Sequence, residues 1–431
     1  MATTVLELCQ VAPPPNAVEE QRLPLVHFDI MFLPIVSRIT LFYQLPCCSK
    51  SHFLESIIPN LKNSLSLTLK AGNIIFPLNN TGKKPIPRYV LGDSVSLTIA
   101  ESNADFHHLT GDHALEADIF HAFVPPLPKP NSYDDYISIP VVSLQVTLFP
   151  NKGICIGFTN KHCIDDGATL TGFLQAWSSI NKFNGDDDYL QQENYLPCYD
   201  RTTIEDPNGL DLILWNQMKM FSPTLSPTIS FPTDRVQATF IVSEADIKRL
   251  KSIVLEKLPS LAHVSTFLTD DNEPEYFTFA ADCRLRLKPP LPYTYFGNCV
   301  TLAKAETTHG NLKGNEGVVA AAEAISEAIH KTLYNEKGIL DGVVNRLKEL
   351  KELAGKRAVR VSRSPRFDLY GVDFGWGRTK KFEPVSIDPR GFFSLSKSRT
   401  IGGGVQISYS KPKIQMERFA AIFNQELRGY S

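Results

Sequence analysis

The sequence predicts an α/β protein of two domains, and three observations support this prediction. At 431 residues the chain exceeds the roughly 250 to 300 residues that one core usually accommodates. Strand-like and helix-like segments alternate in both halves, which is typical of mixed sheets with flanking helices. The composition, 43% hydrophobic and 21% charged, is that of an ordinary globular protein.

A proline-rich stretch between Ser222 and Asp234 marks the expected boundary between the two halves. Prolines at short intervals without apolar periodicity are typical of a connection that belongs to neither core. We therefore expect an N-terminal domain over residues 1–185, a crossover linker over residues 186–235 and a C-terminal domain over residues 236–431.

In the first half, apolar alternation and helical periodicity predict the main elements. The expected strands cover residues 4–8, 41–45, 95–100, 141–149 and 154–158, and the expected helices start near residues 51 and 167. In the second half, strands are expected over residues 236–242, 276–280, 392–395 and 405–409, and helices over residues 245–258, 317–333 and 413–427.

One histidine stands where a strand ends and a helix begins. His162 follows the apolar strand over residues 154–158, and a stripe of apolar residues at helical spacing comes after it: Leu170, Phe173, Leu174, Trp177 and Ile180. A neutral imidazole accepts a proton near neutral pH, which suits general-base catalysis on a hydroxyl. Most lone histidines near a strand end are core or capping residues, so the interpretation depends on companion motifs.

Composition also excludes several classes of function. A formal net charge of −2 argues against a nucleic-acid partner, which calls for a strongly basic balance. The N-terminus lacks a basic stretch followed by an apolar one, and no apolar run is long enough to span a bilayer. From these two features we expect a soluble protein of the cytoplasm. The eight cysteines show no ligand spacing for zinc, so we expect no metal site.

Four short motifs follow one another along the chain. They are His162-x-x-x-Asp166-Gly167, Asp282-Cys283-Arg284, Tyr295-Phe296-Gly297-Asn298-Cys299 and Asp373-Phe374-Gly375-Trp376-Gly377. In this order they resemble the motifs of the plant BAHD family of acyl-CoA-dependent acyltransferases. The Tyr-Phe-Gly-Asn-Cys stretch looks most like the branch that acts on anthocyanins and other flavonoid or phenolic glucosides. The resemblance extends from Val5 to Phe423.

The resemblance implies a two-domain fold like that of chloramphenicol acetyltransferase, with an active-site channel at the domain interface. It implies that His162 deprotonates the acceptor hydroxyl, which then attacks the thioester of an acyl-CoA. No acyl-enzyme is expected, and no Gly-x-Ser-x-Gly nucleophile elbow is present. Acyl-CoA and a phenolic glucoside are the implied substrates of a monomer, and no bound cofactor is implied.

The resemblance also assigns roles to further residues. Asp166 is expected to pair with Arg284 and to hold the architecture of the site rather than to orient the imidazole. Asp373, Gly375 and Gly377 are expected to form a structural turn. A smaller set is expected to contact acyl-CoA or the acceptor: Asn298, Trp376 and Ser394. For Ser394, an exposed position without function is an equal alternative, because strand residues alternate between faces.

Four departures from the family pattern stand out. Lys161 replaces a common second histidine, and Arg363 replaces the glycine of a Gly-Ser-Pro element. Segments that relatives carry after Lys70 and after Phe267 are missing. The loss of apolar segments lowers stability, since each large buried apolar side chain contributes roughly 1.5 to 3 kcal/mol.

The sequence leaves alternatives open for the acyl donor and for the activity itself. A malonyl group needs a nearby cation, for which Lys161 and Arg363 are candidates, and malonyl-CoA is the first expectation. The alternatives are a hydroxycinnamoyl donor such as coumaroyl- or caffeoyl-CoA, a catalytically silent binding protein of the same fold, and a self-acylating hydrolase.

Overall fold

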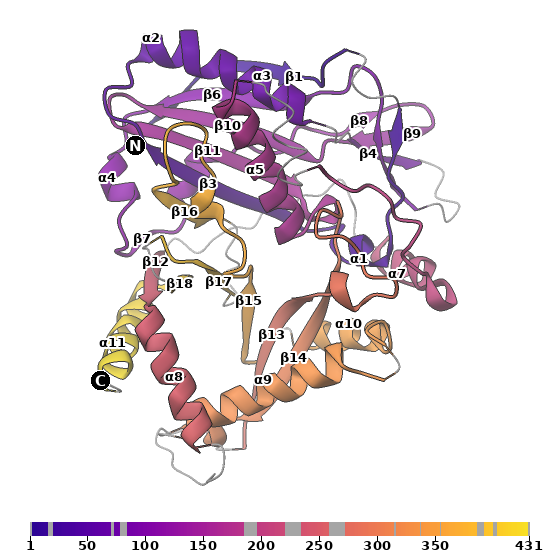
Figure 1. Ribbon diagram of the computed structural model, residues 1–431, viewed down its shortest axis with the longest axis vertical. Helices are drawn as coiled ribbons and strands as arrows, with labels where there is room; N and C mark the ends of the chain where they lie inside the picture. The colour runs from indigo at the N-terminus through magenta and orange to yellow at the C-terminus, as the bar shows by residue number, and fades with distance from the viewer. Residues whose placement is uncertain are drawn as a thin grey trace. The chain divides into compact units, whose positions relative to one another are not determined.

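The structure is a computed structural model of the whole chain (Figure 1). It describes residues 2–15, 20–69, 73–77, 84–184, 196–219, 234–257, 272–313, 316–336, 338–353, 355–385, 392–399 and 403–429. These residues fall into two compact units. The first unit contains Met1–Thr233, Leu291–Cys299 and Phe367–Ser386, and the second contains Asp234–Pro290, Val300–Arg366 and Ile387–Ser431.

A six-stranded mixed sheet forms the centre of the first unit (Figure 1). Its strands, in spatial order, are β1 (Thr3–Val11), β6 (Val95–Ser102), β10 (Val142–Phe149), β11 (Gly153–Lys161), β3 (Val36–Gln44) and β16 (Lys381–Pro384). β10 runs parallel to β6, whereas the other neighbours are antiparallel. Every residue of β10 and β11 is buried, as expected for central strands covered on both faces.

A smaller sheet and several helices complete the first unit. The sheet has the order β2 (Gln21–Arg22), β5 (Ile86–Tyr89), β4 (Asn73–Pro77), β9 (Tyr136–Ile139) and β8 (Asn131–Ser132), and β7 (Leu115–Glu116) is a further short strand. The helices are α1 (His27–Ile30), α2 (Lys50–His52), a π-helical turn (Phe53–Ile57), α3 (Ile58–Thr68), α4 (Phe106–Leu109), α5 (Gly167–Lys182) and α7 (Leu210–Met218). Short 3-10 turns cover Ile119–Phe123, His162–Ile164, Pro207–Gly209 and Leu369–Gly371.

Helix α5 packs on α3 through its predicted apolar stripe. Leu174, Trp177 and Ile180 are buried, and the indole N–H of Trp177 donates to the hydroxyl of Ser64 on α3 at 3.1 Å. The prediction of a buried helix after His162 is therefore confirmed.

The second unit is built on another mixed sheet. Its strands have the order β14 (Val300–Thr308), β13 (Pro274–Asp282), β15 (Ala358–Ser362), β17 (Phe392–Lys397), β18 (Val405–Pro412) and β12 (Arg235–Val242). Its helices are α8 (Glu244–Lys257), α9 (Gly317–Leu333), α10 (Val343–Lys351) and α11 (Lys413–Gly429), with 3-10 turns over Arg284–Arg286 and Gly310–Leu312. The parallel pairs are β13 with β15 and β15 with β17.

The predicted face of α11 packs on this sheet. Met416 is 2% exposed, and the Phe419 ring meets the Phe240 ring of β12 edge-on, with centroids 5.1 Å apart. The predicted fold class, α/β with two mixed sheets and flanking helices, is confirmed.

The units differ from the linear division expected from the sequence. Leu291–Cys299 and Phe367–Ser386, expected in the C-terminal half, pack with the first unit. Within the expected linker, Leu214 and Trp215 of α7 are buried in the first unit, because α7 covers α1 with an apolar side. Most of the stretch from Ser222 to Asp234 lies outside the described residues, as do the positions after Lys70 and Phe267 where segments are missing.

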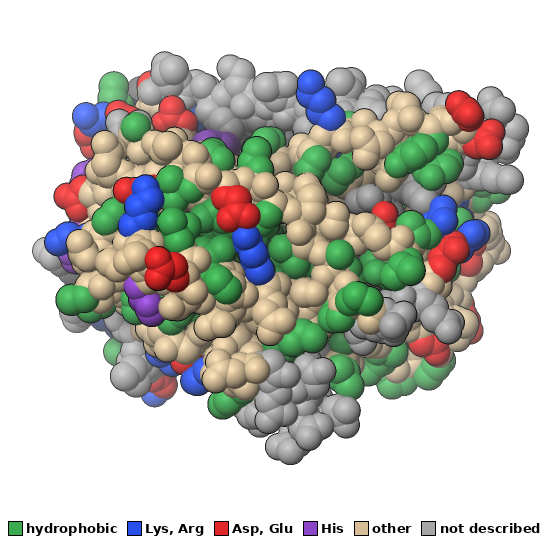
Figure 2. Space-filling model, turned by 90° about the horizontal axis from the view of Figure 1, so that it is seen from above, with side chains coloured by type: hydrophobic (Ala, Val, Ile, Leu, Met, Phe, Trp, Pro, Cys, Tyr) green, Lys and Arg blue, Asp and Glu red, His purple; other side chains and the backbone are tan. Residues whose placement is uncertain are grey.

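The surface view shows charges of both signs dispersed among apolar side chains on one face (Figure 2). This mixture agrees with the formal net charge of −2. No helix among the described residues is long and apolar enough to cross a membrane.

Candidate active site

His162 lies directly after β11, at the first position of a single 3-10 turn. Its backbone N–H donates to the carbonyl of Ile35 at 2.9 Å, and its own carbonyl accepts from Nδ2 of Asn298 at 2.9 Å. The imidazole stacks on the ring of Phe32, with centroids 4.4 Å apart and planes 14° from parallel. His162 as a whole is half-buried, and the contact with Phe32 restricts the position of its ring.

Asp166 caps the helix that follows. Its Oδ1 accepts the backbone N–H groups of Ala168 and Thr169, both at 3.1 Å, and its Oδ2 accepts the N–H of Cys299 at 3.1 Å. A capping carboxylate satisfies N–H groups that have no partner within the helix. Asp166 therefore joins α5 to the loop that carries Asn298, which is an architectural role.

Arg284, the predicted partner of Asp166, belongs to the second unit. There its Nη1 donates to Oδ1 of Asp282 at 3.3 Å, and the side chain is buried. The pairing of Asp166 with Arg284 stays a prediction.

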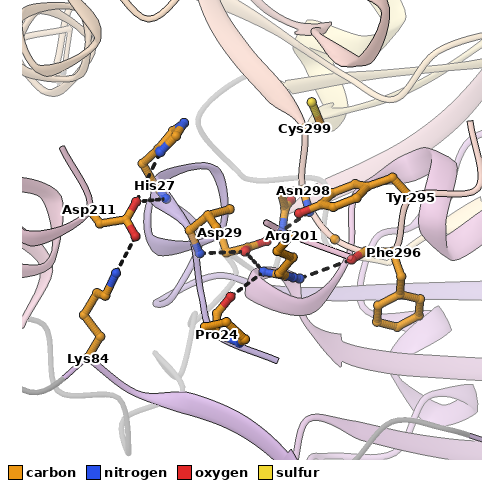
Figure 3. Close-up of polar contacts among 12 residues, drawn as sticks. Pro24, His27, Asp29, Lys84, Arg201, Asp211, Tyr295, Phe296, Asn298 and Cys299 are labelled. Atoms are coloured by element: carbon orange, nitrogen blue, oxygen red, sulfur yellow. Dashed lines mark hydrogen bonds and ion pairs between the residues drawn. The ribbon is translucent and has the colours of Figure 1, made fainter. Parts of the chain in front are cut away.

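Asn298 lies beside the buried ion pair of Asp29 and Arg201 (Figure 3), and it connects this pair to His162. The Asn298 side chain is fully buried and donates both to the His162 carbonyl and to Oδ1 of Asp29, the latter at 3.1 Å. Its backbone N–H also donates to Asp29, at 3.0 Å. The other Asp29 oxygen accepts from Arg201, and both side chains of this pair are almost completely buried.

The loop around Asn298 needs a glycine. Gly297 has φ +143°, and a Cβ there would lie 2.5 Å from Nη2 of Arg201. Arg201 in turn donates to the Phe296 carbonyl at 3.2 Å, and the hydroxyl of Thr169 on α5 donates to the Gly297 carbonyl at 3.0 Å. The Tyr295 to Cys299 motif is thus held by contacts within the first unit.

The segment Asp373 to Gly377 forms a turn closed by its own aspartate. Asp373 Oδ1 accepts the N–H groups of Gly375 and Gly377, both at 2.8 Å, and Oδ2 pairs with Lys182 at the end of α5. Both glycines have φ near +90°, in the left-handed region that favours glycine. The predicted structural turn is present in the first unit.

The aromatic residues of this turn pack inward. Phe374 is 1% exposed and meets the Trp177 ring edge-on at 4.9 Å, and Trp376 stacks on Phe374 at 5.5 Å. These contacts account for both aromatic residues structurally. A contact of Trp376 with acyl-CoA stays a prediction.

Replacement of Asp373 by asparagine is expected to make stability depend less on pH. Burial raises the pKa of the Asp373 carboxyl, but the bonds from Lys182, Gly375 and Gly377 more than offset this, so the pKa lies below its ordinary value. A lowered folded-state pKa stabilises the protein above the ordinary pKa of about 3.9, and this stabilisation is lost as the pH falls through the folded-state value. Urea unfolding should therefore show Asp373→Asn weaker than wild type at pH 7, with a difference that shrinks below about pH 4; a constant difference would contradict this.

Ser394 lies on β17 of the second unit and is 1% exposed, so the alternative of an exposed position is wrong. Arg363, also in the second unit, has φ +66°. This left-handed conformation explains why the family pattern has glycine at the position. Lys161 is buried beside His162, and burial lowers the pKa of its ammonium group.

Sequence reasoning missed Phe32, Asp29 and Arg201. The signal for Asp29 is a single acid within the apolar run from His27 to Phe32, because a buried carboxylate requires a partner. Nothing in the sequence indicates that the partner is Arg201, 172 residues away.

A second buried acid, Asp211 on α7, lies beside α1, the short helix that carries Asp29 (Figure 3). It accepts from the backbone N–H of His27 at 2.7 Å, lies 3.1 Å from Nδ1 of the same residue, and pairs with Lys84. His27, Asp206 and Asp211 form the one group of potential metal ligands among the described residues. The ammonium group of Lys84 already supplies a positive charge to Asp211, so the arrangement is a structural ion pair.

Comparison with known proteins agrees with this architecture. A model of the Transferase family matches residues 4–426. The chain is 40% identical to a malonyl-coenzyme:anthocyanin 5-O-glucoside-6'''-O-malonyltransferase of Salvia splendens, over 100% of this chain and 96% of that protein. It is 43% identical to phenolic glucoside malonyltransferase 1 of Nicotiana tabacum, over 89% of this chain and 90% of that protein.

Among solved structures, vinorine synthase has the same fold. The TM-score is 0.68 at 18% identity, and the match covers 96% of each chain. With the family model and relatives of about 40% identity over almost the full length, the chain belongs to the BAHD family of acyl-CoA-dependent acyltransferases.

Proposed function

We propose that this enzyme transfers a malonyl group from malonyl-CoA to a sugar hydroxyl of an anthocyanin, flavonoid or other phenolic glucoside. The observation that carries the proposal is the long similarity to two malonyltransferases of such glucosides, combined with a half-buried histidine fixed at the end of β11.

His162 acts as the general base in this proposal. The imidazole takes the proton of the sugar hydroxyl while the oxygen attacks the thioester carbonyl carbon. The tetrahedral intermediate collapses with cleavage of the C–S bond, and the CoA thiolate recovers the proton from the imidazolium. A positioned general base contributes roughly 100- to 10,000-fold in rate.

The two architectural motifs support this role indirectly. Asp166 is fully engaged as a helix cap and as an acceptor for Cys299, which favours catalysis by the histidine without an aspartate relay. Asp373 is likewise engaged within its own turn.

A malonyl donor carries a free carboxylate, which calls for a cation near the acyl group. Lys161 in the first unit and Arg363 in the second are the candidates, and both stand where the family pattern has other residues. Donors without this carboxylate, such as coumaroyl-CoA, need an apolar pocket instead.

Purified protein should release CoA from malonyl-CoA only when a phenolic glucoside is present. The measurement uses a thiol reagent, with malonyl-CoA and coumaroyl-CoA each tested against anthocyanin and flavonol glucosides. Faster turnover with coumaroyl-CoA would replace the donor assignment but keep the reaction. No release with any pair would favour a silent binding protein, and a covalent acyl adduct in mass spectrometry would favour a self-acylating enzyme.

A further inference from the structure

One short segment of the first unit supports His162. It contacts the imidazole ring and the backbone N–H of His162 directly, and it anchors Asn298, which binds the His162 carbonyl. The segment runs from Val26, which caps α1, to Ile35, just before β3. We propose that this segment positions the catalytic base, with Phe32 holding the imidazole ring and Asn298, anchored on Asp29, holding the backbone. The inference rests on the proposed role of His162 as general base.

The ring of Phe32 contacts the flat face of the His162 imidazole. Phe32 is 8% exposed, and its ring lies nearly parallel to the imidazole at a centroid distance of 4.4 Å. A parallel aromatic face restricts rotation of the imidazole about its side-chain bonds. It also attracts a cation through the negative face of the ring, so it stabilises the imidazolium that forms when the base takes a proton.

The backbone contacts fix the residue from both sides. The Ile35 carbonyl accepts the His162 N–H, and Asn298 donates to the His162 carbonyl, each at 2.9 Å. Asn298 is itself held by two bonds to Asp29, whose second oxygen binds Arg201. A displacement of about 1 Å in a catalytic group can cost roughly 100-fold in rate, so this anchoring bears on turnover.

The acidic groups near His162 have hydrogen-bond or ion-pair partners other than Phe32. Asp29 of the α1 segment binds Asn298 and Arg201, Asp165 accepts from Asn160 at 2.5 Å, and Asp166 caps α5. The remaining titratable side chains on these elements are His27, which lies against Asp211, and Lys161, Cys163, Tyr295 and Cys299. Because these groups are common to all Phe32 variants, we attribute a difference between the variants to the aromatic face.

The test compares Phe32→Leu with Phe32→Tyr in the full-length enzyme. Leucine keeps the apolar bulk but removes the aromatic face, so we expect kcat to fall about tenfold, with KM changed little. Without the aromatic face the imidazolium is less stable, so the acidic limb of the pH profile of kcat/KM should lie about 0.5 to 1 pH unit lower. Tyrosine keeps the face and should restore the wild-type limb.

Two further variants separate positioning from stability. Phe120→Leu removes another buried aromatic ring, from a different cluster of the first unit, and should lower the melting temperature while leaving the pH limb in place. Asn298→Leu should lower kcat about 10- to 100-fold with an unchanged acidic limb, because it acts on the backbone.

The outcomes distinguish the inference from the function on which it rests. If Phe32→Leu keeps both the wild-type kcat and the wild-type limb while His162→Ala is inactive, the positioning role is wrong and the base assignment stands. If Phe32→Leu and Phe120→Leu alter the pH profile alike, the effect is structural and the inference fails. If His162→Ala keeps its activity, the proposed function fails first.

Discussion

Replacement of His162 by alanine is expected to lower kcat by about 100- to 10,000-fold and to leave the fold intact. The loss follows from the removal of the only group in the proposed reaction that accepts the hydroxyl proton. The fold should survive because the backbone bonds of His162, to Ile35 and Asn298, do not involve the imidazole.

Steady-state CoA release and a thermal unfolding midpoint check this result together. His162→Gln, which keeps a polar side chain of similar size, serves as the matched variant and should be equally inactive. Retention of most of the activity by either variant would remove the base assignment. Loss of activity together with an early unfolding midpoint would instead indicate a structural histidine.

Replacement of Arg201 by methionine is expected to destabilise the first unit by about 3 to 5 kcal/mol. The change leaves the carboxylate of Asp29 without its counter-charge, although Asp29 is 0% exposed. It also removes the donors to the carbonyls of Pro24 and Phe296. An uncompensated charge in the interior is among the largest effects a single substitution produces.

Urea unfolding of Arg201→Met measures this effect, with Lys62→Met as the matched control. Lys62 pairs with Glu7 at 2.7 Å, but both side chains are substantially exposed, and such pairs contribute about 0 to 1 kcal/mol. We therefore expect a large shift for Arg201→Met and almost none for Lys62→Met. Equal shifts for both variants would contradict the importance assigned to burial.

The elements around the histidine were predictable because their signals are local. Apolar runs on both sides of a turn predicted β10 and β11, and helical spacing predicted α5. The helix cap formed by Asp166 has an equally local signal, an aspartate directly before a helix, but Asp166 was expected only to pair with Arg284.

The remaining support of the site was not predictable, because it depends on contacts distant in sequence. Asn298 reaches His162 across 136 positions, and Asp29 reaches Arg201 across 172. The expected role of Asn298 as a ligand contact rested on family resemblance, whereas its donors are occupied by Asp29 and the His162 carbonyl. The periodicity of a short stretch of sequence cannot predict contacts between residues so far apart in the chain.

The first unit is discontinuous along the chain, because it includes Leu291–Cys299 and Phe367–Ser386. A fragment truncated after Thr233 would lack β16 at the sheet edge, the cap contact from Cys299 and the anchor from Asn298. During synthesis on the ribosome Phe32 and Ile35 precede the histidine, but Asn298, Cys299 and β16 follow it by more than a hundred residues, so the site is completed only after most of the polypeptide has been translated.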